Sequence, residues 1–297
     1  LVGSEMCIRD SNQMIAETKI VSPNSPPIQR NWWVYLILLL VCFINFIPYL
    51  WTVLTAFMDA ASASATSPKW FFTPSLEAFR YLIFEKRILW NFANSMVVSI
   101  GSTFFSVTIG MFCAYAIARY DFPGRDDVSF WVLTNRMMPP VAVLIPIFVT
   151  FQTLKLLDNV IGLIILYTAM QLPFVVWMLT GYFRDIPKRY EESAMIDGDT
   201  WFAAFRKVTL PLMAPSITAT AIFVMILSWN EFAFATFLTS NNAKTLPPAI
   251  MAYSIGADIK WNILGAAVVL ITAPLILFVL VMQRQLISGL SQGVIRK

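Results

Sequence analysis

The chain has 297 residues, of which 58% are hydrophobic and only 13% are charged. Soluble domains are about half apolar and about a quarter charged, so this balance excludes an ordinary soluble domain and indicates an integral membrane protein. The formal net charge of +4 is modest and spread along the chain, which gives no reason to expect a nucleic-acid partner. There is no His, which removes His-based catalytic triads and the commonest transition-metal ligand.

Neither the cysteines nor the glycines predict a catalytic or cofactor site. Cys7, Cys42 and Cys113 are odd in number and widely spaced, so they predict neither a disulfide framework nor a metal site. No Gly is followed by Lys, so the phosphate-binding loop Gly-x-x-x-x-Gly-Lys-Ser/Thr is missing. We therefore expect no enzyme activity in this chain, no bound cofactor and no metal.

The first 31 residues are polar and contain three prolines without a helical period. We expect residues 1–31 to form a flexible cytoplasmic tail. The chain opens on Leu, so its first residues are consistent with a fragment edge or with non-native sequence, and Met6 or Met14 is an alternative start. No small-residue cleavage site follows an apolar core there, so we predict no removable signal peptide.

Six apolar stretches follow, each long enough to cross a bilayer core that needs about 20 residues of helix. Six such runs in one chain make buried helices of a soluble protein an improbable alternative. The second, residues 92–118, also carries Ser, Thr, Gly and Ala positions that allow helices to pack closely. The sequence therefore predicts an all-α, polytopic membrane protein with six transmembrane helices. The stretches are residues 33–57, 92–118, 128–154, 159–183, 216–238 and 263–282.

The distribution of Lys and Arg predicts the orientation of these spans. With the N-terminus inside, thirteen Lys and Arg residues fall in cytoplasmic segments and seven fall on the opposite side, while Arg136 lies within a span, which accounts for all 21. The side with more basic residues is normally the cytoplasmic one. Both termini and the loop of residues 184–215 are therefore predicted to be cytoplasmic.

Two charged residues, Arg136 and Glu231, lie within predicted spans, where charge is costly and is usually functional or paired. A sugar or polyol site needs amide and carboxylate groups for hydroxyls, and aromatic faces for stacking on C–H surfaces. The alternative is that Arg136 and Glu231 pair with each other, or with a neighbouring subunit, to hold the helices together. The candidate residues of the solute pathway are Arg136, Tyr167, Gln171, Trp177, Trp229, Asn230 and Glu231.

The most densely charged segment is the cytoplasmic loop of residues 184–215, which carries the signals of two short helices. Asp185 is a candidate cap for the first helix, with Pro187 in its first turn and two glutamates close behind. Gly198 should break this helix, and Asp197 or Asp199 is a candidate cap for the second.

In the second helix, Trp201, Phe205 and Val208 recur at helical spacing and predict one apolar face, and Pro211 is expected to end the element. An amphipathic loop that merely lies on lipid headgroups is the alternative interpretation.

The residues of this loop resemble the EAA loop of bacterial ABC-importer permeases. The match consists of Glu192, Ala194, Gly198 and the pair Leu210-Pro211 at the family spacing. Ser193 stands where the family usually has Ala, and the residue after Gly198 is Asp rather than a small one. Residues 136–140, Arg-Met-Met-Pro-Pro, and residues 228–232, Ser-Trp-Asn-Glu-Phe, resemble the carbohydrate-importer branch, which includes the G subunit of maltose permeases.

The resemblance covers about residue 33 to the C-terminus and implies the type I ABC-importer permease fold over residues 32–297. It implies a transport subunit whose loop enters a cleft of a separate ABC ATPase dimer, which binds ATP and Mg. It further implies a second, non-identical permease subunit, a periplasmic solute-binding protein and a lipid-embedded position in the bacterial inner membrane. The residues assigned to the ATPase-coupling loop are Glu192, Ser193, Ala194, Asp197, Gly198, Phe205, Leu210 and Pro211.

Two other classes of transporter remain as alternatives. One is an ABC permease for a solute that is not a carbohydrate. The other is an ion-driven secondary transporter, which would work without an ATPase and usually shows internal repeats with broken helices at matching places. No convincing repeat relates the two halves of this chain, and such a transporter has no use for a docking loop.

Overall fold

The computed structural model describes residues 32–254 and 259–291, so the predicted tail of residues 1–31 lies outside the described residues. Within the described ranges the chain forms helices and no strand, which confirms the all-α prediction. The chain divides into two compact units, Leu1–Leu50 and Trp51–Lys297. Helix α2, Trp32–Ala56, crosses this division.

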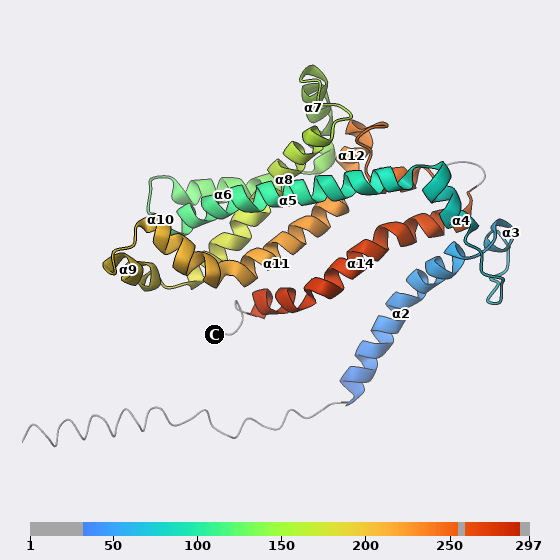
Figure 1. Ribbon diagram of the computed structural model, residues 1–297, viewed down its shortest axis with the longest axis horizontal. Helices are drawn as coiled ribbons and strands as arrows, with labels where there is room; N and C mark the ends of the chain where they lie inside the picture. Colours follow the sequence, from blue (N-terminus) through green and yellow to red (C-terminus); the bar gives the residue numbers. More distant parts are fainter. Residues whose placement is uncertain (1–31, 255–258, 292–297) are drawn as a thin grey trace, which may run out of the picture. The chain divides into compact units, whose positions relative to one another are not determined.

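Long apolar helices form where most of the uncharged stretches predict them (Figure 1). Five helical segments in the described residues are long and apolar enough to cross a membrane, and a bent pair of helices supplies a sixth candidate. In addition to α2, the long helices are α5 (Ile88–Arg119), α8 (Val160–Asp185), α11 (Leu210–Trp229) and α14 (Trp261–Ser291).

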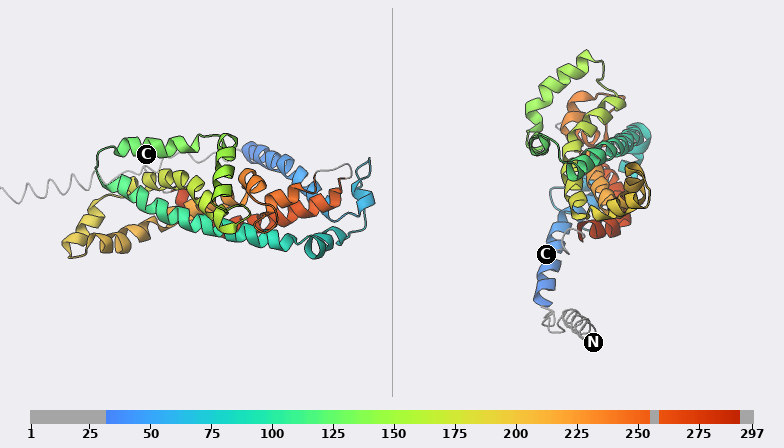
Figure 2. Two further views of the ribbon diagram at one scale, coloured as in Figure 1. Left: turned by 90° about the horizontal axis from the view of Figure 1, so that it is seen from above. Right: turned by 90° about the vertical axis from the view of Figure 1, so that its left-hand side faces the viewer.

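The third predicted span is not one helix but two, α6 (Arg125–Arg136) and α7 (Pro140–Thr153), bent by 93°. Figure 2 shows α7 turning away from the direction of α6. The prolines explain the break. Pro139 adopts extended backbone with ψ 126°, and Pro140 starts α7 in its first turn, where a missing N–H costs nothing.

The fifth predicted span is also divided. Helix α11 ends at Trp229, and a separate helix, α12 (Ala233–Leu238), follows after a short break. The Glu231 carboxylate accepts hydrogen bonds from the backbone N–H groups of Phe234 at 2.9 Å and Ala235 at 3.1 Å. A side chain that bonds these otherwise unpaired N–H groups favours the start of a new helix over continuation of the old one.

Pro211 does not end a helix, contrary to the sequence prediction. The chain is helical without interruption from Trp201 to Trp229, because a π-helical turn, η2 (Phe205–Thr209), stands directly before α11. In a π turn the backbone hydrogen bonds span five residues instead of four, and this change occurs directly before Pro211, which has no N–H to donate. The other short elements are α3 (Ala60–Ala63), α4 (Glu77–Arg80), the π-helix η1 (Tyr81–Glu85), α9 (Arg189–Ile196), α10 (Trp201–Ala204) and α13 (Leu246–Met251).

Helix α5 packs along α8 and α11 through a buried stripe of small residues. Gly110 approaches α8 so closely that an added Cβ would lie 2.6 Å from Cγ1 of Val175. Ser102 donates a hydrogen bond of 3.2 Å to Ser228 in α11. Small residues let helix backbones approach closely in a membrane, as the sequence predicts for this span. The stripe consists of Ser95, Ser99, Ser102, Ser106 and Gly110.

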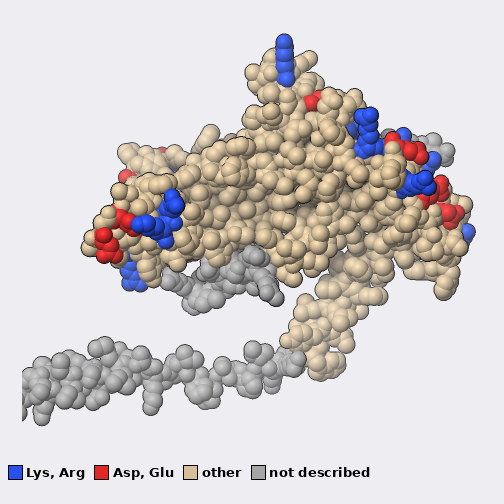
Figure 3. Space-filling view, viewed as in Figure 1, with Lys and Arg blue, Asp and Glu red and all other residues tan. Residues whose placement is uncertain are grey.

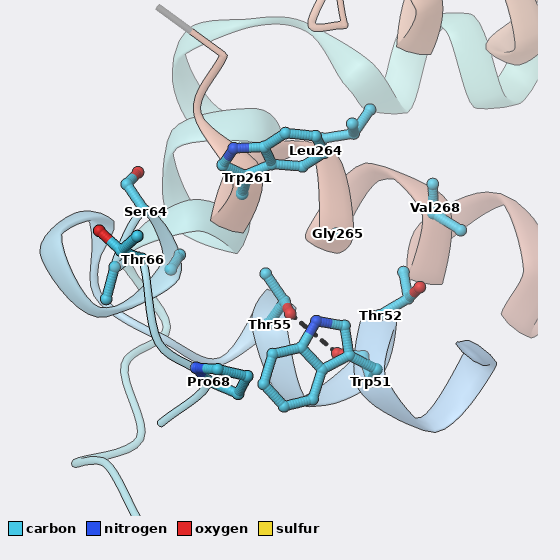
Figure 4. Close-up of a pocket in the computed structure, with 12 residues that line it drawn as sticks. Trp51, Thr52, Thr55, Ser64, Thr66, Pro68, Trp261, Leu264, Gly265 and Val268 are labelled. Carbon is cyan, nitrogen blue, oxygen red and sulfur yellow. Dashed lines mark hydrogen bonds between the residues drawn. The ribbon is translucent and has the colours of Figure 1, made fainter. Parts of the chain in front are cut away.

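The last turn of α2, which belongs to the second unit, packs on α14 at Gly265. A Cβ at this glycine would lie 3.0 Å from both the Ala56 nitrogen and the Thr52 oxygen. Beside the contact is a cavity of about 510 Å³, with Trp51 and Trp261 on its two sides (Figure 4). Here the backbones of α2 and α14 touch with no side chain between them.

Candidate functional site

Helix α9, in the loop of residues 184–215, ends in a glycine turn. Gly198 has φ +96°, a left-handed conformation that favours Gly, and no atom lies within 4 Å of where its Cβ would be. Its N–H donates to the Met195 carbonyl, and the N–H of Asp199 reaches back to the Ala194 carbonyl, both at 3.1 Å. This pair of bonds is the Schellman arrangement, and it confirms Gly198 as the break between the two short helices.

The helix caps differ from those expected. Asp185 is the last residue of α8, and Lys188 stands at the N-cap of α9 without a side-chain cap bond. Helix α10 is capped by Thr200, whose hydroxyl accepts from the Ala203 N–H at 3.3 Å. Asp199 instead pairs with Lys207 at 2.6 Å. Thr is a good N-cap residue, as are the acidic residues Asp197 and Asp199 that precede it in the sequence.

A buried polar network holds α9 against the end of α5, and its centre is Glu191. The Glu191 carboxylate accepts hydrogen bonds from the Tyr115 hydroxyl at 2.7 Å, from Nε of Arg119 at 2.9 Å and from the Thr209 hydroxyl at 2.6 Å. Arg119 also donates to the Ile186 carbonyl at 2.9 Å. One carboxylate thus joins α5, α9 and the π-turn η2.

Aromatic rings surround this network. Phe205 is buried at 3% exposure and lies edge-on to Tyr115, with 4.7 Å between ring centroids. Tyr115 also meets Phe183 of α8 at 5.4 Å, and Trp201 stacks on Phe205 at 6.4 Å. Of the predicted apolar face, Phe205 packs inward against α5 and α8, whereas Val208 is half-buried and Trp201 stays exposed.

Most of the loop residues that match the family pattern are exposed, whereas the network around Glu191 beneath them is buried. Sequence reasoning placed both glutamates at the start of the helix but missed that Glu191 is the buried one, since one residue turns the side chain by about 100°. The sequence feature that could have indicated a buried acidic partner is Arg119, a cation at the end of an otherwise uncharged span. Glu192, Ser193, Asp197, Gly198 and Pro211 are exposed, Ala194 and Leu210 are half-buried, and Phe205 is buried.

A second polar site lies at the bend between α6 and α7. A cavity of about 620 Å³ is lined by Arg136 and Asn135 from α6, by Gln171 from α8, and by apolar side chains of α7 and α8. The Arg136 guanidinium donates to the Gln171 amide oxygen at 3.1 Å and lies 5.0 Å from the Phe174 ring centroid. A planar cation on an aromatic ring, with an amide beside it, can bind hydroxyl or anionic oxygens.

Glu231 does not pair with Arg136. Its carboxylate accepts from the buried Tyr167 hydroxyl at 2.5 Å in addition to the two N–H groups of α12. Phe234, whose N–H is one of these donors, lines the Arg136 cavity. Glu231 and Tyr167 therefore position one wall of this cavity, whereas Arg136 and Gln171 line the cavity themselves.

The remaining three candidates of the solute pathway lie elsewhere. Trp177 lines a separate cavity of about 240 Å³. Trp229 is buried at 3% exposure, donates to the Ile271 carbonyl at 3.2 Å and packs edge-on to Phe92. Asn230 is exposed and donates to the Ile226 carbonyl of its own helix at 2.8 Å. The structure brings none of the three to the Arg136 cavity.

Charged side chains of the second unit gather at its ends. On the face shown in Figure 3, Lys, Arg, Asp and Glu cluster over α9 and α10 on the left and near the start of α5 on the right. The surface along α5 and α11 between them carries none. Because charge is expensive in the hydrocarbon core, this distribution fits helices that span a bilayer.

Comparison with known proteins agrees with this geometry. Residues 106–292 match the family described as binding-protein-dependent transport system inner membrane component. A probable ABC transporter permease protein of Sinorhizobium fredii is 32% identical, over 86% of this chain and 92% of its own length. The trehalose transport system permease protein of Mycobacterium tuberculosis is 34% identical, over 69% of this chain and 77% of its own length.

A solved structure shows the same fold. It belongs to a bacterial ABC transporter involved in the import of the acidic polysaccharide alginate, and it superposes with a TM-score of 0.70 at 20% identity. The match covers 88% of this chain and 99% of the other. The long apolar helices, the shared fold and the family match lead to one conclusion. This chain belongs to the family of binding-protein-dependent transport system inner membrane components and is a multi-pass transport permease.

Proposed function

We propose that this chain is the membrane subunit of an ATP-driven importer that carries a sugar or polyol from the periplasm to the cytoplasm. ATP and Mg bind to a separate ATPase dimer, and a periplasmic solute-binding protein delivers the solute. A second, non-identical permease completes the pathway. Both termini and the loop of α9 and α10 face the cytoplasm, in keeping with the excess of basic residues on that side.

The observation that carries this proposal is the anchoring of α9. Its exposed residues, from Glu192 to Gly198, form a small free surface, while Glu191 on its other side is locked to Arg119 at 2.9 Å. A force applied to the free surface is therefore passed to α5 and, through Thr209, to the helix that continues into α11. A loop that merely rests on lipid has no need of a buried ion pair beneath it.

A saccharide solute is supported by the chemistry of the Arg136 cavity. Arg136 and Gln171 offer charged and amide hydrogen-bonding groups beside the Phe174 ring, the combination that binds hydroxyls and C–H faces of sugars. The similarity to a trehalose transport system permease points to the same class of solute. The site has room for a sugar, since its volume is about 620 Å³.

The test replaces Gly198 with Val in the complete transporter, purified with its ATPase and reconstituted in proteoliposomes. A β-branched residue is strained at φ +96°, so the end of α9 must change shape, although no neighbouring atom is displaced. We expect ATP hydrolysis to continue while solute uptake falls at least tenfold. Gly124→Val is the matched control, because Gly124 also has positive φ (+80°) and open space around it but lies outside the coupling loop.

The two variants separate a coupling role from general damage. If Gly198→Val transports normally, or if Gly124→Val is equally uncoupled, the coupling role of the α9 turn is wrong. If no ATPase co-purifies and uptake follows an ion gradient, the protein is a secondary transporter and the proposal fails as a whole.

A further inference from the structure

A basic cavity lies at the opposite end of α5 from the coupling loop. Its volume is about 450 Å³, and its lining comes from two segments, the start of α5 with the residues before it, and the loop after α12. Helix α5 has 32 residues and so spans about 48 Å, which places this cavity on the far side of the membrane from α9. The lining residues are Lys86, Arg87, Trp90, Asn91, Ser240, Asn241, Asn242 and Lys244.

The backbone of the cavity loop is fixed by hydrogen bonds to Asp158 and to side chains of α5. The carboxylate of Asp158 accepts hydrogen bonds from four consecutive backbone N–H groups, residues 240 to 243, at 3.0 to 3.2 Å. From the other side, Trp90 and Asn94 of α5 donate to the Asn242 carbonyl at 3.0 Å and 2.7 Å. Ala243, in the middle of the loop, is fully buried. The loop is therefore held in one conformation without the help of its polar side chains.

The three asparagine amides of the cavity, unlike the Trp90 indole, take no part in holding this loop. The amides of Asn91, Asn241 and Asn242 form no hydrogen bond with any residue that the structure describes. The three cations, Lys86, Arg87 and Lys244, form no ion pair within the same described ranges.

One of the cations is held by a tyrosine of the protein itself. The Lys86 ammonium lies 5.4 Å from the centroid of the Tyr81 ring. A hydrogen bond with Tyr81, together with the nearby Glu85 carboxylate, raises the pKa of Lys86, so its ammonium stays protonated at the rim of the cavity.

No acidic residue lines the cavity. Glu85 is adjacent to Lys86 in sequence but does not contribute to the lining, and Asp158 is occupied by the loop N–H groups. Three cations with amide donors between them are suited to a carboxylate, which accepts several charge-assisted hydrogen bonds. The chemistry of the cavity is thus that of a receptor for one or two carboxylate groups.

We propose that this cavity receives an acidic side chain, Asp or Glu, from the solute-binding protein when that protein docks on the outer face. This inference rests on the proposed function for the existence and side of docking. A docked side chain fits better than the transported solute, because this cavity and the Arg136 cavity share no lining residue. The exposed positions of Lys86 and Arg87 allow a protein surface to reach them without rearrangement.

The experiment measures binding of the cognate solute-binding protein to the complete transporter in nanodiscs. The variant is the charge reversal Lys86→Glu with Lys244→Glu, and the control is Lys69→Glu, an exposed lysine outside the cavity. Charge complementarity acts on association and on specificity, so we expect the dissociation constant to rise about tenfold or more in the double variant and less than about twofold in the control. The wild-type affinity should fall between about 50 and 300 mM NaCl, and the variant should lose this dependence.

A charge-swap scan of the binding protein identifies the partner residue. One Asp→Lys or Glu→Lys change should restore binding to the double variant and weaken binding to the wild type. Equal binding by variant, control and wild type would overturn the proposal.

Two further measurements distinguish the remaining outcomes. If free glucuronate stabilises the transporter against heating and the double variant loses this effect, the cavity binds an anionic sugar and the docking proposal is wrong. ATP hydrolysis at saturating binding protein should reach the same maximum in all three forms. If hydrolysis is absent in all of them under these conditions, the failure belongs to the proposed function rather than to this cavity.

Discussion

The guanidinium of Arg119, the last residue of α5, lies 2.9 Å from the carboxylate of Glu191 in α9, and the two side chains are only 5% and 9% exposed. Burying two charges costs several kcal/mol each unless hydrogen bonds satisfy them, and Tyr115, Thr209 and the Ile186 carbonyl supply those bonds here. The ion pair therefore contributes most by joining α9 to α5 in one orientation. Helix α9 is thereby attached to the bundle of long apolar helices.

Replacing Glu191 with Ala should destabilise the protein by about 3–5 kcal/mol, because Arg119 is left buried without its counter-charge. Thermal unfolding in detergent measures this loss. Glu192→Ala is the matched control, since Glu192 is the exposed neighbour on the same helix and should change stability by less than about 0.5 kcal/mol. Equal effects of the two substitutions would contradict the assignment of Glu191 as the anchor.

Gly110→Ala should separate α5 from α8. The new methyl group would meet Val175 at 2.6 Å, and overpacking of this kind costs about 1–3 kcal/mol. Gly181→Ala is expected to have the opposite sign, a gain of about 0.5–1 kcal/mol, because Gly181 is also inside a helix but has no atom within 4 Å of the added group. Unfolding temperatures of the two variants in one detergent provide the comparison, and a destabilised Gly181→Ala would refute it.

Asp158 predicts a pH dependence for the loop of residues 240–243. Partial burial acts to raise the pKa of its carboxyl, but the bonds from the backbone N–H groups of residues 240–243 outweigh it and lower the pKa from 3.8 to about 2. Because the pKa is lower in the folded state, the charged carboxylate stabilises the folded loop at every pH above the pKa of the unfolded state. This stabilisation is lost as the pH falls from about 4 to about 2. The loop should therefore be insensitive to pH between about 5 and 8, where the carboxylate is fully charged in both states.

Hydrogen exchange of the peptide covering residues 239–245 tests this prediction. Asp158→Ala should raise its exchange rate at pH 7, as the N–H groups lose their acceptor, whereas Asp158→Asn retains one acceptor oxygen and should have an intermediate effect. Asn also tolerates the left-handed backbone of this position, where φ is 52°. An unchanged exchange rate in Asp158→Ala would show that other contacts hold the loop.

Arg136→Lys should weaken the apparent affinity for the solute in proteoliposome uptake. Lys keeps the charge but loses the planar contact with Phe174 and the geometry of the bond to Gln171. A hydrogen bond to a charged group contributes about 1.5–3 kcal/mol, so KM should rise about tenfold or more. Asn230→Ala is the control, because the Asn230 amide bonds its own helix outside the cavity, and its KM should stay within about twofold of the wild type.

Much of the fold follows from the sequence because an uncharged run of 20 or more residues has few stable alternatives in a membrane. Two consecutive prolines, Pro139 and Pro140, account for the break in the third run, although not for its 93° angle. The end of α9 at Gly198 could be predicted because helices commonly end on a residue that adopts positive φ, which favours Gly. These features depend on local chemistry, which the sequence contains directly.

The side-chain partners could not be predicted because they come from distant elements. Trp229 resembles a sugar-stacking residue in sequence, yet it donates to Ile271, 42 positions away, and belongs to the core. Glu231 has the charge of a ligand-binding group but is satisfied by Tyr167 and by the start of α12. Choosing Glu191 over Glu192 required the rotation of α9 about its axis, which the contacts with α5 determine.

The continuous run of helix from Trp201 to Trp229 joins the short helix α10 and a long apolar helix into one element. Its 29 residues correspond to about 43 Å, so a tilt of about 5° at the Trp201 end displaces the far end by about 4 Å. The far end is next to Glu231, which positions the start of α12 and the wall of the Arg136 cavity. A small rocking motion at the Trp201 end is thus amplified at the Arg136 cavity, and the π turn η2 and Pro215 are the points at which this helix can bend.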